Sequence, residues 1–387
     1  MRIHAMRPQP GNFSWLLVPY LFVSICVNVN WSPAMAQTEP YPQSPIVQSI
    51  AFDWSTHRRE ASGSDNWPIT WADDGHQYTS WGDGGGFGGT NSDGRVSLGV
   101  ARVEGAASSY TGFNVWGGKN PETSATFEGK SYGILSVSGV LYMWVSPGSN
   151  TQNFDEARLY QSTDHGHSWQ AASWKFVKGD GIILPTFLQF GQDYQGARDN
   201  FVYIYANHLK DSSGLKVQKP GEIALMRVPK TAIMDRSAYE FFAGLTPQGV
   251  PIWTQNIQDR KPVFEDPNGV GWNTSVTYNQ GLDRYFLMTE HGQTSKGKLG
   301  IFDAPEPWGP WTTVLYTEQF GDSAIEASTF FWNFSNKWSS VDGREFVMIF
   351  TGIGSNDSWN TVTGSFVLST PDVMPPNPPT GLTFSGS

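Results

Sequence analysis

The stretch "SDNWPITWADDGHQYTSWGDGGGFGG", residues 64–89, holds four Asp, three Trp and a run of glycines. Apolar and polar residues alternate on both sides of an Asp-Gly pair, a pattern typical of a β-hairpin with a tight turn. If the turn centres on Asp74, Asp65 lies directly opposite Asp83 at the open end of the hairpin. The first structural prediction is therefore an aromatic hairpin with a carboxylate on each of its two open ends.

The same pattern recurs along the chain in short runs such as "SYGILSVSGVLYMWVSP" (131–147) and "SVTYNQGLDRYFLMTEHG" (275–292). Gly, Asp, Asn and Pro bound these runs, as expected for strands joined by turns. The best candidate for a helix is 229–245. Many short hairpins without long helices predict an all-β protein, either a sandwich, a barrel or a propeller.

The segment "STDHGHSW", residues 162–169, has the S-x-D-x-G-x-[ST]-W form of the Asp-box found in sialidase-like propellers. In those proteins the Asp and the Gly form a turn between two outer strands, and the Trp packs into the blade. The motif favours the β-propeller among the three architectures. It also gives Asp164, His165 and His167 a structural role, so we do not take them as catalytic.

The ends of the chain differ from its middle. Arg2 and Arg7 precede an apolar run and small residues, which indicates a secretory signal peptide and a secreted or periplasmic protein. Cys26, the single cysteine, lies inside that run, so we expect no disulfide. The predicted division is a signal peptide at 1–36, a lead-in at 37–47, a propeller at 48–370 and a Pro-rich tail at 371–387.

The overall charge limits the partners. The formal net charge is -10, and only 16% of the residues are charged. No basic stripe is present to bind phosphates or anionic lipids, so we expect no nucleic acid and no membrane partner. The sequence holds no recognisable metal, nucleotide or cofactor motif. Oxygen-rich loops are compatible with a structural calcium ion, but nothing specifies one. We expect a monomer.

The Asp pair suggests carbohydrate chemistry. Two carboxylates at a cross-strand distance repel each other, so one of Asp65 and Asp83 is expected to hold a proton. A protonated and an ionised carboxyl group flanking a sugar is what a glycosidase requires. A register slip of one residue would instead pair Asn66 with Asp83. Trp67 and Trp81 offer flat faces for a sugar, and together with Asn66 they are predicted to bind substrate.

A second hairpin adds further candidates. Its turn lies near Gly281 and sets Asn273 opposite Glu290. Glu290 is a candidate general acid working with Asp65, although it equally fits a buried carboxyl group hydrogen-bonded to the backbone. The predicted substrate-binding residues from this hairpin and from elsewhere in the chain are Trp272, Asn273, His291 and Arg158. Glu326 is a weaker third acid.

Three motifs carry a resemblance to a known family: "DNWPITW" (65–71), "YTSWGDGGGFGG" (78–89) and "APEPWGPWT" (304–312). They resemble domain-of-unknown-function family 4185, which is similar to five-bladed β-propeller glycoside hydrolases that include endo-D-arabinanases of actinobacteria. The resemblance implies five blades and two catalytic Asp residues, which match Asp65 and Asp83 here.

The leading hypothesis is thus a hydrolase acting on a polysaccharide or oligosaccharide. One alternative is a propeller polysaccharide lyase that cleaves a uronic-acid-containing glycan with His76, His291, Tyr278 and Arg158. An acidic protein is a poor partner for a polyuronate, which disfavours this alternative. The other is a glycan-binding propeller without catalysis, in which the carboxylates only accept hydrogen bonds from sugar hydroxyls.

Overall fold

The computed structural model describes residues 38–146, 153–154, 156–213, 215–321, 325, 328–353 and 356–369. The predicted signal peptide, the Pro-rich tail and Glu326 lie outside the described residues. Within them no helix has the length and hydrophobicity needed to cross a bilayer.

Strands dominate the described chain, in successive antiparallel groups. The first group has the order β2 (Ile69–Trp71), β3 (Gln77–Gly82), β4 (Leu98–Glu104) and β5 (Thr111–Trp116). The second has the order β6 (Lys130–Val137), β7 (Val140–Ser146), β8 (Arg158–Ser162) and β9 (Gln170–Ala171). The third contains β10 (Ile182–Gln189), β11 (Phe201–His208), β12 (Gly221–Pro229), β13 (Glu240–Leu245), β14 (Pro251–Thr254) and β15 (Pro262–Asp266), which pairs with β12.

The remaining strands form two more groups. One has the order β16 (Thr274–Asn279), β17 (Arg284–Glu290), β18 (Leu299–Ala304) and β19 (Thr312–Thr317). The other has the order β20 (Phe330–Phe334), β21 (Glu345–Ile353), β22 (Asn356–Leu368) and β1 (Val47–Glu60). The short 3-10 helices are η1 (Lys178–Asp180), η2 (Gln192–Tyr194), η3 (Arg236–Ala238) and η4 (Ile257–Asp259).

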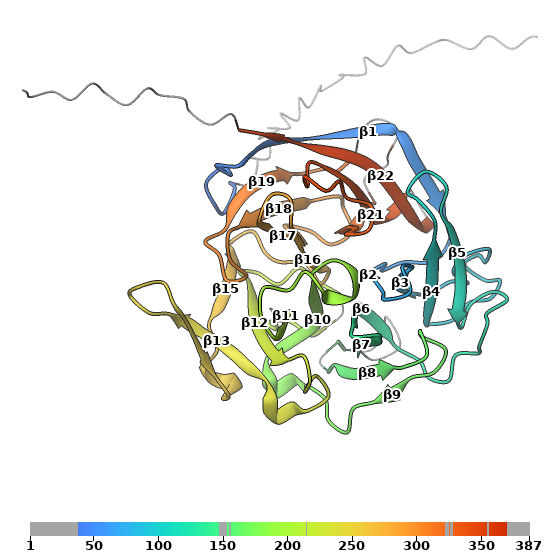
Figure 1. Cartoon of the computed structure of the whole chain (residues 1–387), viewed down its shortest axis with the longest axis horizontal. Coiled ribbons are helices and arrows are strands. Elements are labelled where there is room, and N and C mark those ends of the chain that lie inside the picture. The colour runs from blue at the N-terminus through green and yellow to red at the C-terminus, as the bar shows by residue number, and fades with distance from the viewer. Residues whose placement is uncertain are drawn as a thin grey trace, which may run out of the picture. The chain divides into compact units, whose positions relative to one another are not determined.

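These groups are arranged around a common centre. Figure 1 shows them in chain order around that centre, with β2, β6, β10 and β16 innermost. A short parallel contact, Leu188 with Val276 and Gln189 with Thr277, joins β10 to β16 and links their two groups into one curved sheet. The all-β class and the β-propeller predicted from the sequence are confirmed.

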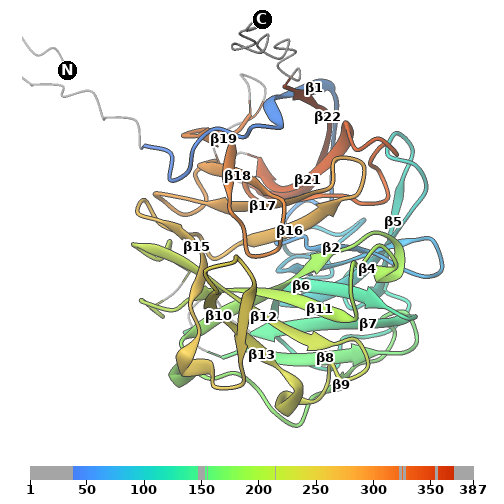
Figure 2. The ribbon, with the colours of Figure 1, turned by 60° about the vertical axis from the view of Figure 1, so that its left-hand side comes forward.

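The first strand closes the ring. β1 pairs antiparallel with β22, from Val47 opposite Leu368 to Glu60 opposite Trp359. Both ribbon views show β1 lying along β22 at the outer edge of the last group (Figures 1 and 2). The N-terminal and C-terminal strands therefore share one sheet, and the last group is completed by the beginning of the chain.

Residues before β1 also contact the propeller. Gln43 bridges Thr313 of β19, and the Tyr41 ring packs against Phe264 and Phe302 at centroid distances of 5.2 and 5.8 Å. The predicted lead-in thus lies along the β16–β19 group over residues 41–44.

The core lies between neighbouring groups, because the inner strands of each sheet bury both of their faces. One buried cluster joins Trp67 and Trp81 of the first group to Ile349 and Trp359 of the last. Another joins β3, β4 and β5 to β6 and β7. β6 and β10 are buried at every residue, including Lys130 and Ser131, because they lie between neighbouring strands on both sides.

The helix predicted over 229–245 is wrong. β12 ends at Pro229, a turn and η3 follow, and β13 begins at Glu240. Phe241 and Phe242 pair with Thr254 and Trp253 of β14. Aromatic residues are favoured in strands, and sheet pairing here outweighs a weak helical spacing.

Ring closure should depend on Trp359. Its ring is fully buried and meets Trp67 edge-on at 5.4 Å, and its Nε1–H donates to the hydroxyl of Tyr110 at 3.0 Å. Trp359→Ala is expected to lower the free energy of unfolding by about 3–5 kcal/mol, because it leaves a large cavity between two groups. Chemical denaturation measures this change. Val341→Ala, at a fully exposed position, serves as the control; a loss of equal size in both variants would contradict the role of Trp359.

Candidate active site

The first hairpin adopts the predicted register within its strands and departs from it at the open end. Ile69 faces Thr79 and Trp71 faces Gln77, as a turn centred on Asp74 requires. Beyond the strands, Asp65 pairs with Gly82 through N–H to O bonds of 2.9 and 2.7 Å. The predicted direct pairing of Asp65 with Asp83 is therefore wrong by one residue. Pro68 has no N–H for the ladder, which allows the shift.

Two residues at this open end have left-handed backbones. Asn66 has φ 59° and Asp83 has φ 55°. Asn and Asp tolerate this region better than other non-glycine residues, at a cost that surrounding contacts must offset. Between them in space lies Gly82, where a Cβ would come within 2.8 Å of Oδ1 of Asp65 and 3.0 Å of Cδ of Lys130. The glycine allows a carboxylate and a lysine to lie against the strand.

Asp65 is a buried acid. Its residue is 9% exposed, and Nδ2 of Asn66 donates to its Oδ1 at 2.7 Å. Burial raises the pKa of Asp65 well above its usual value; the charges of Asp357 and Asp83 raise it further, and Lys130 opposes the rise. This environment favours the protonated form of Asp65.

Asp83 is paired with two cations. Nζ of Lys130 lies 2.5 Å from its Oδ1, and a guanidinium nitrogen of Arg95 lies 3.2 Å from its Oδ2. The Lys130 side chain is only 2% exposed and that of Asp83 is 19% exposed. Asp83 borders an open cavity of about 510 Å³, which is lined by Asp83, Arg95, Val96, Ser97, Ala125, Thr126, Phe127 and Glu128. Asp83 thus presents an ion-paired carboxylate to a space that solvent reaches.

A third carboxylate belongs to the same cluster, and the sequence reasoning missed it. Asp357 lies at the start of β22, and its carbonyl accepts a hydrogen bond of 2.5 Å from the N–H of Gly63. Burial raises the pKa of Asp357, the charge of Asp83 adds to the rise, and Lys130 opposes it. The cluster therefore gathers residues from the last, first and second strand groups.

Several buried polar atoms near these carboxylates have no hydrogen-bond partner among the residues that the structure describes. The Tyr132 hydroxyl of β6 is one, and burial together with the charges of Asp65 and Asp83 raises its pKa. The Oδ1 atom of Asn66 is another. Such groups require water or a ligand to satisfy them, since an unpaired buried polar atom is costly. Asn66, predicted to bind substrate, lies in this cluster, whereas Tyr132 and Lys130 carried no motif that could have revealed them.

The tryptophans predicted as sugar platforms belong to the core. Trp67 and Trp81 are both fully buried and stack on each other at 5.8 Å. A Cβ at Gly99 would come within 2.2 Å of the Trp81 ring. Trp272 is 4% exposed and meets the Tyr132 ring edge-on at 5.2 Å. None of the three offers a free face, so these predictions are wrong.

Glu290 lies in the second hairpin, whose predicted register is present from Thr274 opposite Thr289 to Asn279 opposite Arg284. Its residue is fully buried, its Oε1 accepts the N–H of Ser295 at 2.6 Å, and its Oε2 has no partner among the described residues. Burial raises the pKa of Glu290 to about 8. Burial alone accounts for the rise, so the carboxyl groups of Asp65 and Asp83 do not act on it. No hydrogen bond or ion pair of the described residues joins Glu290 to either of these carboxyl groups.

The remaining predicted binding residues form no hydrogen bond or ion pair with Asp65 or Asp83 among the described residues. Asn273 is buried, and neither atom of its amide has a described partner. His291 is buried, stacks on Tyr316 at 3.8 Å and bonds the carbonyl of Thr317 at 3.0 Å through Nε2. Burial lowers its pKa to about 4, so it is a neutral core residue and not a substrate ligand. Arg158 lies on β8, two strands away from the innermost β6.

The residues assigned to a lyase are not assembled. His76 lies in the turn between β2 and β3, where its N–H bonds Asp74. Tyr278 lies near the end of β16, and its hydroxyl donates to Asp283 at 2.7 Å. His291 is buried just after β17, beyond the opposite end of the hairpin from Tyr278, and Arg158 lies on β8 of another group.

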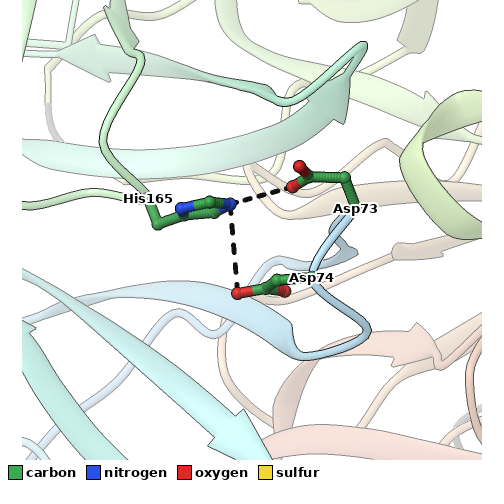
Figure 3. A group of neighbouring side chains, drawn as sticks. All are labelled: Asp73, Asp74 and His165. Carbon is green, nitrogen blue, oxygen red and sulfur yellow. Dashed lines mark hydrogen bonds and ion pairs between the residues drawn. The ribbon is translucent and has the colours of Figure 1, made fainter.

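One group of side chains in the described part of the chain has the spacing of metal ligands: Asp73, Asp74 and His165 (Figure 3). Nε2 of His165 lies 2.9 Å from Oδ1 of Asp73 and 4.0 Å from Oδ2 of Asp74. The contact between His165 and Asp73 connects the first hairpin turn to the turn after β8. In that second turn, the hydroxyl groups of Ser162 and Ser168 also donate to Asp164. These ion pairs account for the arrangement without a metal.

A family model describes the chain from residue 104 to residue 360: domain of unknown function, DUF4185. This range is more than half of the chain. The chain belongs to the DUF4185 family. The matched range contains Lys130 and Asp357, whereas Asp65 and Asp83 precede it. No curated protein matches this DUF4185 chain.

Solved structures similar to this DUF4185 protein are distant in sequence. A thermostable family-43 glycoside hydrolase is 14% identical, with a TM-score of 0.45, over 83% of this chain and 91% of its own. An α-L-arabinofuranosidase from Podospora anserina, in complex with cellotriose, is 12% identical, with a TM-score of 0.46, over 84% and 97%. An endo-arabinase from Bacteroides thetaiotaomicron is 12% identical, with a TM-score of 0.44, over 85% and 98%.

The burial of Glu290 gives a prediction for stability. The folded chain holds the Glu290 proton up to about pH 8, whereas the unfolded chain releases it near 4.5. Because the folded state then binds the extra proton, stability is lost as pH rises from about 4.5 to 8, by at most about 1.4 kcal/mol per pH unit. Glu290→Gln should therefore become more stable relative to the parent chain between pH 5 and pH 8.

Thermal unfolding at several pH values measures this difference. Glu345→Gln, at an exposed position of β21, is the matched control and should show no such trend. A Glu290→Gln profile parallel to that of the parent would show that Glu290 is ionised in the folded chain.

Proposed function

We propose that this DUF4185 protein is a secreted glycoside hydrolase that uses Asp65 and Asp83 on a neutral polysaccharide or oligosaccharide. The observation that supports it is the asymmetry of the two carboxyl groups. Asp65 is buried with a raised pKa, and Asp83 is ion-paired to Lys130 at 2.5 Å beside an open cavity. A neighbouring acid and carboxylate with different protonation states is the requirement of glycoside hydrolysis.

In the proposed reaction each group has one task. The carboxylic acid of Asp65 gives its proton to the glycosidic oxygen, which leaves as an alcohol. The carboxylate of Asp83 supplies the electron pair, either to the anomeric carbon or to a proton of the attacking water. Lys130 pairs with the carboxylate of Asp83, and the charge of Asp357 favours the proton on Asp65. After the bond to the sugar is cleaved, water provides the hydroxyl group of the new reducing end and restores the proton.

The propeller provides the frame for this site. We assign each of the strand groups to one blade, which makes five blades with β1 completing the last.

The signal sequence at residues 1–36 would carry the protein out of the cytoplasm. An acidic chain suits an uncharged glycan, since a polyuronate would be repelled. The two alternatives, a lyase and a non-catalytic binding protein, are outcomes of the assay below.

A panel of polysaccharides tests the reaction. Arabinan, arabinoxylan, xylan and a polyuronate are incubated with the chain, and reducing ends and absorbance near 235 nm are read together. We expect new reducing ends without absorbance, and a loss of roughly 10²–10⁴-fold in kcat for Asp65→Asn and for Asp83→Asn. Growth of absorbance would establish a lyase instead. Glycan binding without any product would establish a binding protein.

The charges around Asp65 predict opposite shifts of the pH profile. Activity requires protonated Asp65, so it falls as pH rises through the pKa of that group. Lys130→Met removes a cation that favours ionised Asp65, so the alkaline limb should move to higher pH, by about one unit. Asp357→Asn removes an anion that opposes ionisation, so the same limb should move to lower pH.

Lys175→Met is the matched control, because it removes the same charge from an exposed pair with Glu156. Its kcat/KM profile should coincide with that of the parent. Shifts of Lys130→Met and Asp357→Asn in the same direction would contradict the assignment of Asp65 as the acid. Circular dichroism confirms that each variant is folded.

A further inference from the structure

A second cavity, of about 680 Å³, lies at the other end of the innermost strands. Asp65 precedes β2 and Lys130 begins β6, whereas Trp71 ends β2 and Asn279 ends β16. Trp71 and Asn279 line this cavity, and so does Phe334 at the end of β20. The six residues of β16, at about 3.3 Å each, put roughly 20 Å between the two ends of the strand. The cavity is therefore a separate site from the carboxylate cluster.

The polar side chains that line this cavity carry amide and hydroxyl groups, with one lysine. Among its lining residues that the structure describes, the amide side chains are Gln192, Gln195, Asn279, Gln280 and Asn336. No carboxylate lines it, and Lys337 is the one charged side chain in the lining. Amides donate and accept hydrogen bonds equally, as hydroxyl groups do. An uncharged ligand rich in hydroxyl groups matches this lining, whereas a multiply charged ligand would find at most one counter-charge, Lys337.

Aromatic faces complete the cavity. Trp71 is half-buried, and its Nε1–H already donates to the carbonyl of Gly75 at 3.3 Å. The hydroxyl of Tyr278 is likewise bonded, to Asp283 at 2.7 Å. With their polar ends satisfied, both rings present apolar surface to the cavity. A Cβ at Gly191, which also lines the cavity, would meet nothing within 4 Å, so the space beside it is open.

The rim is accessible to a ligand from solvent. Gln195 and Gln280 are exposed, and Val341 is fully exposed. An exposed apolar side chain beside exposed amides is the mixture that contacts both the C–H groups and the hydroxyl groups of a sugar. Gln192, Asn279 and Asn336 already donate to backbone carbonyls, which leaves the exposed amides of Gln195 and Gln280 to bond the hydroxyl groups of a ligand.

We propose that this amide-lined cavity is a second, non-catalytic site that binds a neutral oligosaccharide. The inference goes beyond the proposed reaction, because binding here requires no turnover. A polysaccharide held at this end would raise the effective concentration of substrate at the carboxylates, as any second attachment does.

Binding of cellotriose, xylotriose and arabinotriose tests the proposal. Titration calorimetry and tryptophan fluorescence are used with the Asp83→Asn chain, so that no probe is consumed. We expect at least one triose to bind, and Trp71→Ala and Gln280→Ala, each added to Asp83→Asn, to raise its Kd about tenfold or more. Gln280 is exposed, so its change leaves the fold intact even if Trp71→Ala does not fold.

Trp253→Ala is the matched control, since Trp253 is half-buried on β14 and does not line the cavity. Absence of binding by all three trioses would overturn the proposal. The proposal would also be overturned if Trp71→Ala and Gln280→Ala changed the Kd of the triose no more than Trp253→Ala changes it.

The polysaccharide assay separates this inference from the proposed reaction. A chain that binds a triose through Trp71 and Gln280 but hydrolyses no glycan retains the second site and refutes the hydrolase. A chain that hydrolyses a glycan but shows no binding at the cavity refutes the second site alone.

Discussion

The pairing of β1 with β22 is the constraint on which the candidate site depends. It attaches the beginning of the chain to its last strand group, and the contact between the N–H of Gly63 and the carbonyl of Asp357 lies directly beside it. A chain whose ends were not joined would leave Asp357 in one blade and Asp65 in another with nothing to fix their separation. Ring closure therefore determines the electrostatics of the cluster as well as the stability of the core.

Burial and the position of Lys130 make the carboxyl groups of the cluster electrostatically different. Desolvation raises the cost of each buried charge, and Lys130 offsets that cost for the group that it contacts, Asp83. Asp65 has no cation at contact distance among the described residues, so burial favours its protonated form. The asymmetry needs no special chemistry in either Asp. It arises because one lysine, itself only 2% exposed, can touch one carboxylate closely and the others only through space.

Local patterns in the sequence predicted local geometry well. The Asp-Gly turn and the alternation around it predicted the register of both hairpins and the two Asp residues at one open end. Lys130 and Asp357 could not be predicted, because they are 65 and more residues from Asp65 and meet it only through packing of blades. The prediction that Trp67, Trp81 and Trp272 bind sugar was wrong for a related reason. An aromatic residue in a blade packs equally well against the next blade or a sugar, and composition does not distinguish the two.

The two ends of the innermost strands differ in chemical character. At the ends where these strands begin, carboxylates and cations are concentrated; at the ends where they finish, amides and aromatic faces line a larger space. A propeller produces this separation because its innermost strands β10 and β16 run parallel, so residues at equal positions in successive blades meet at the same end. Charged groups gathered at one end can set each other's protonation, whereas uncharged groups at the other can hold a polyhydroxylated chain without disturbing that balance. The architecture thus allows catalysis and the binding of a polymer to evolve at opposite ends of the innermost strands of one propeller.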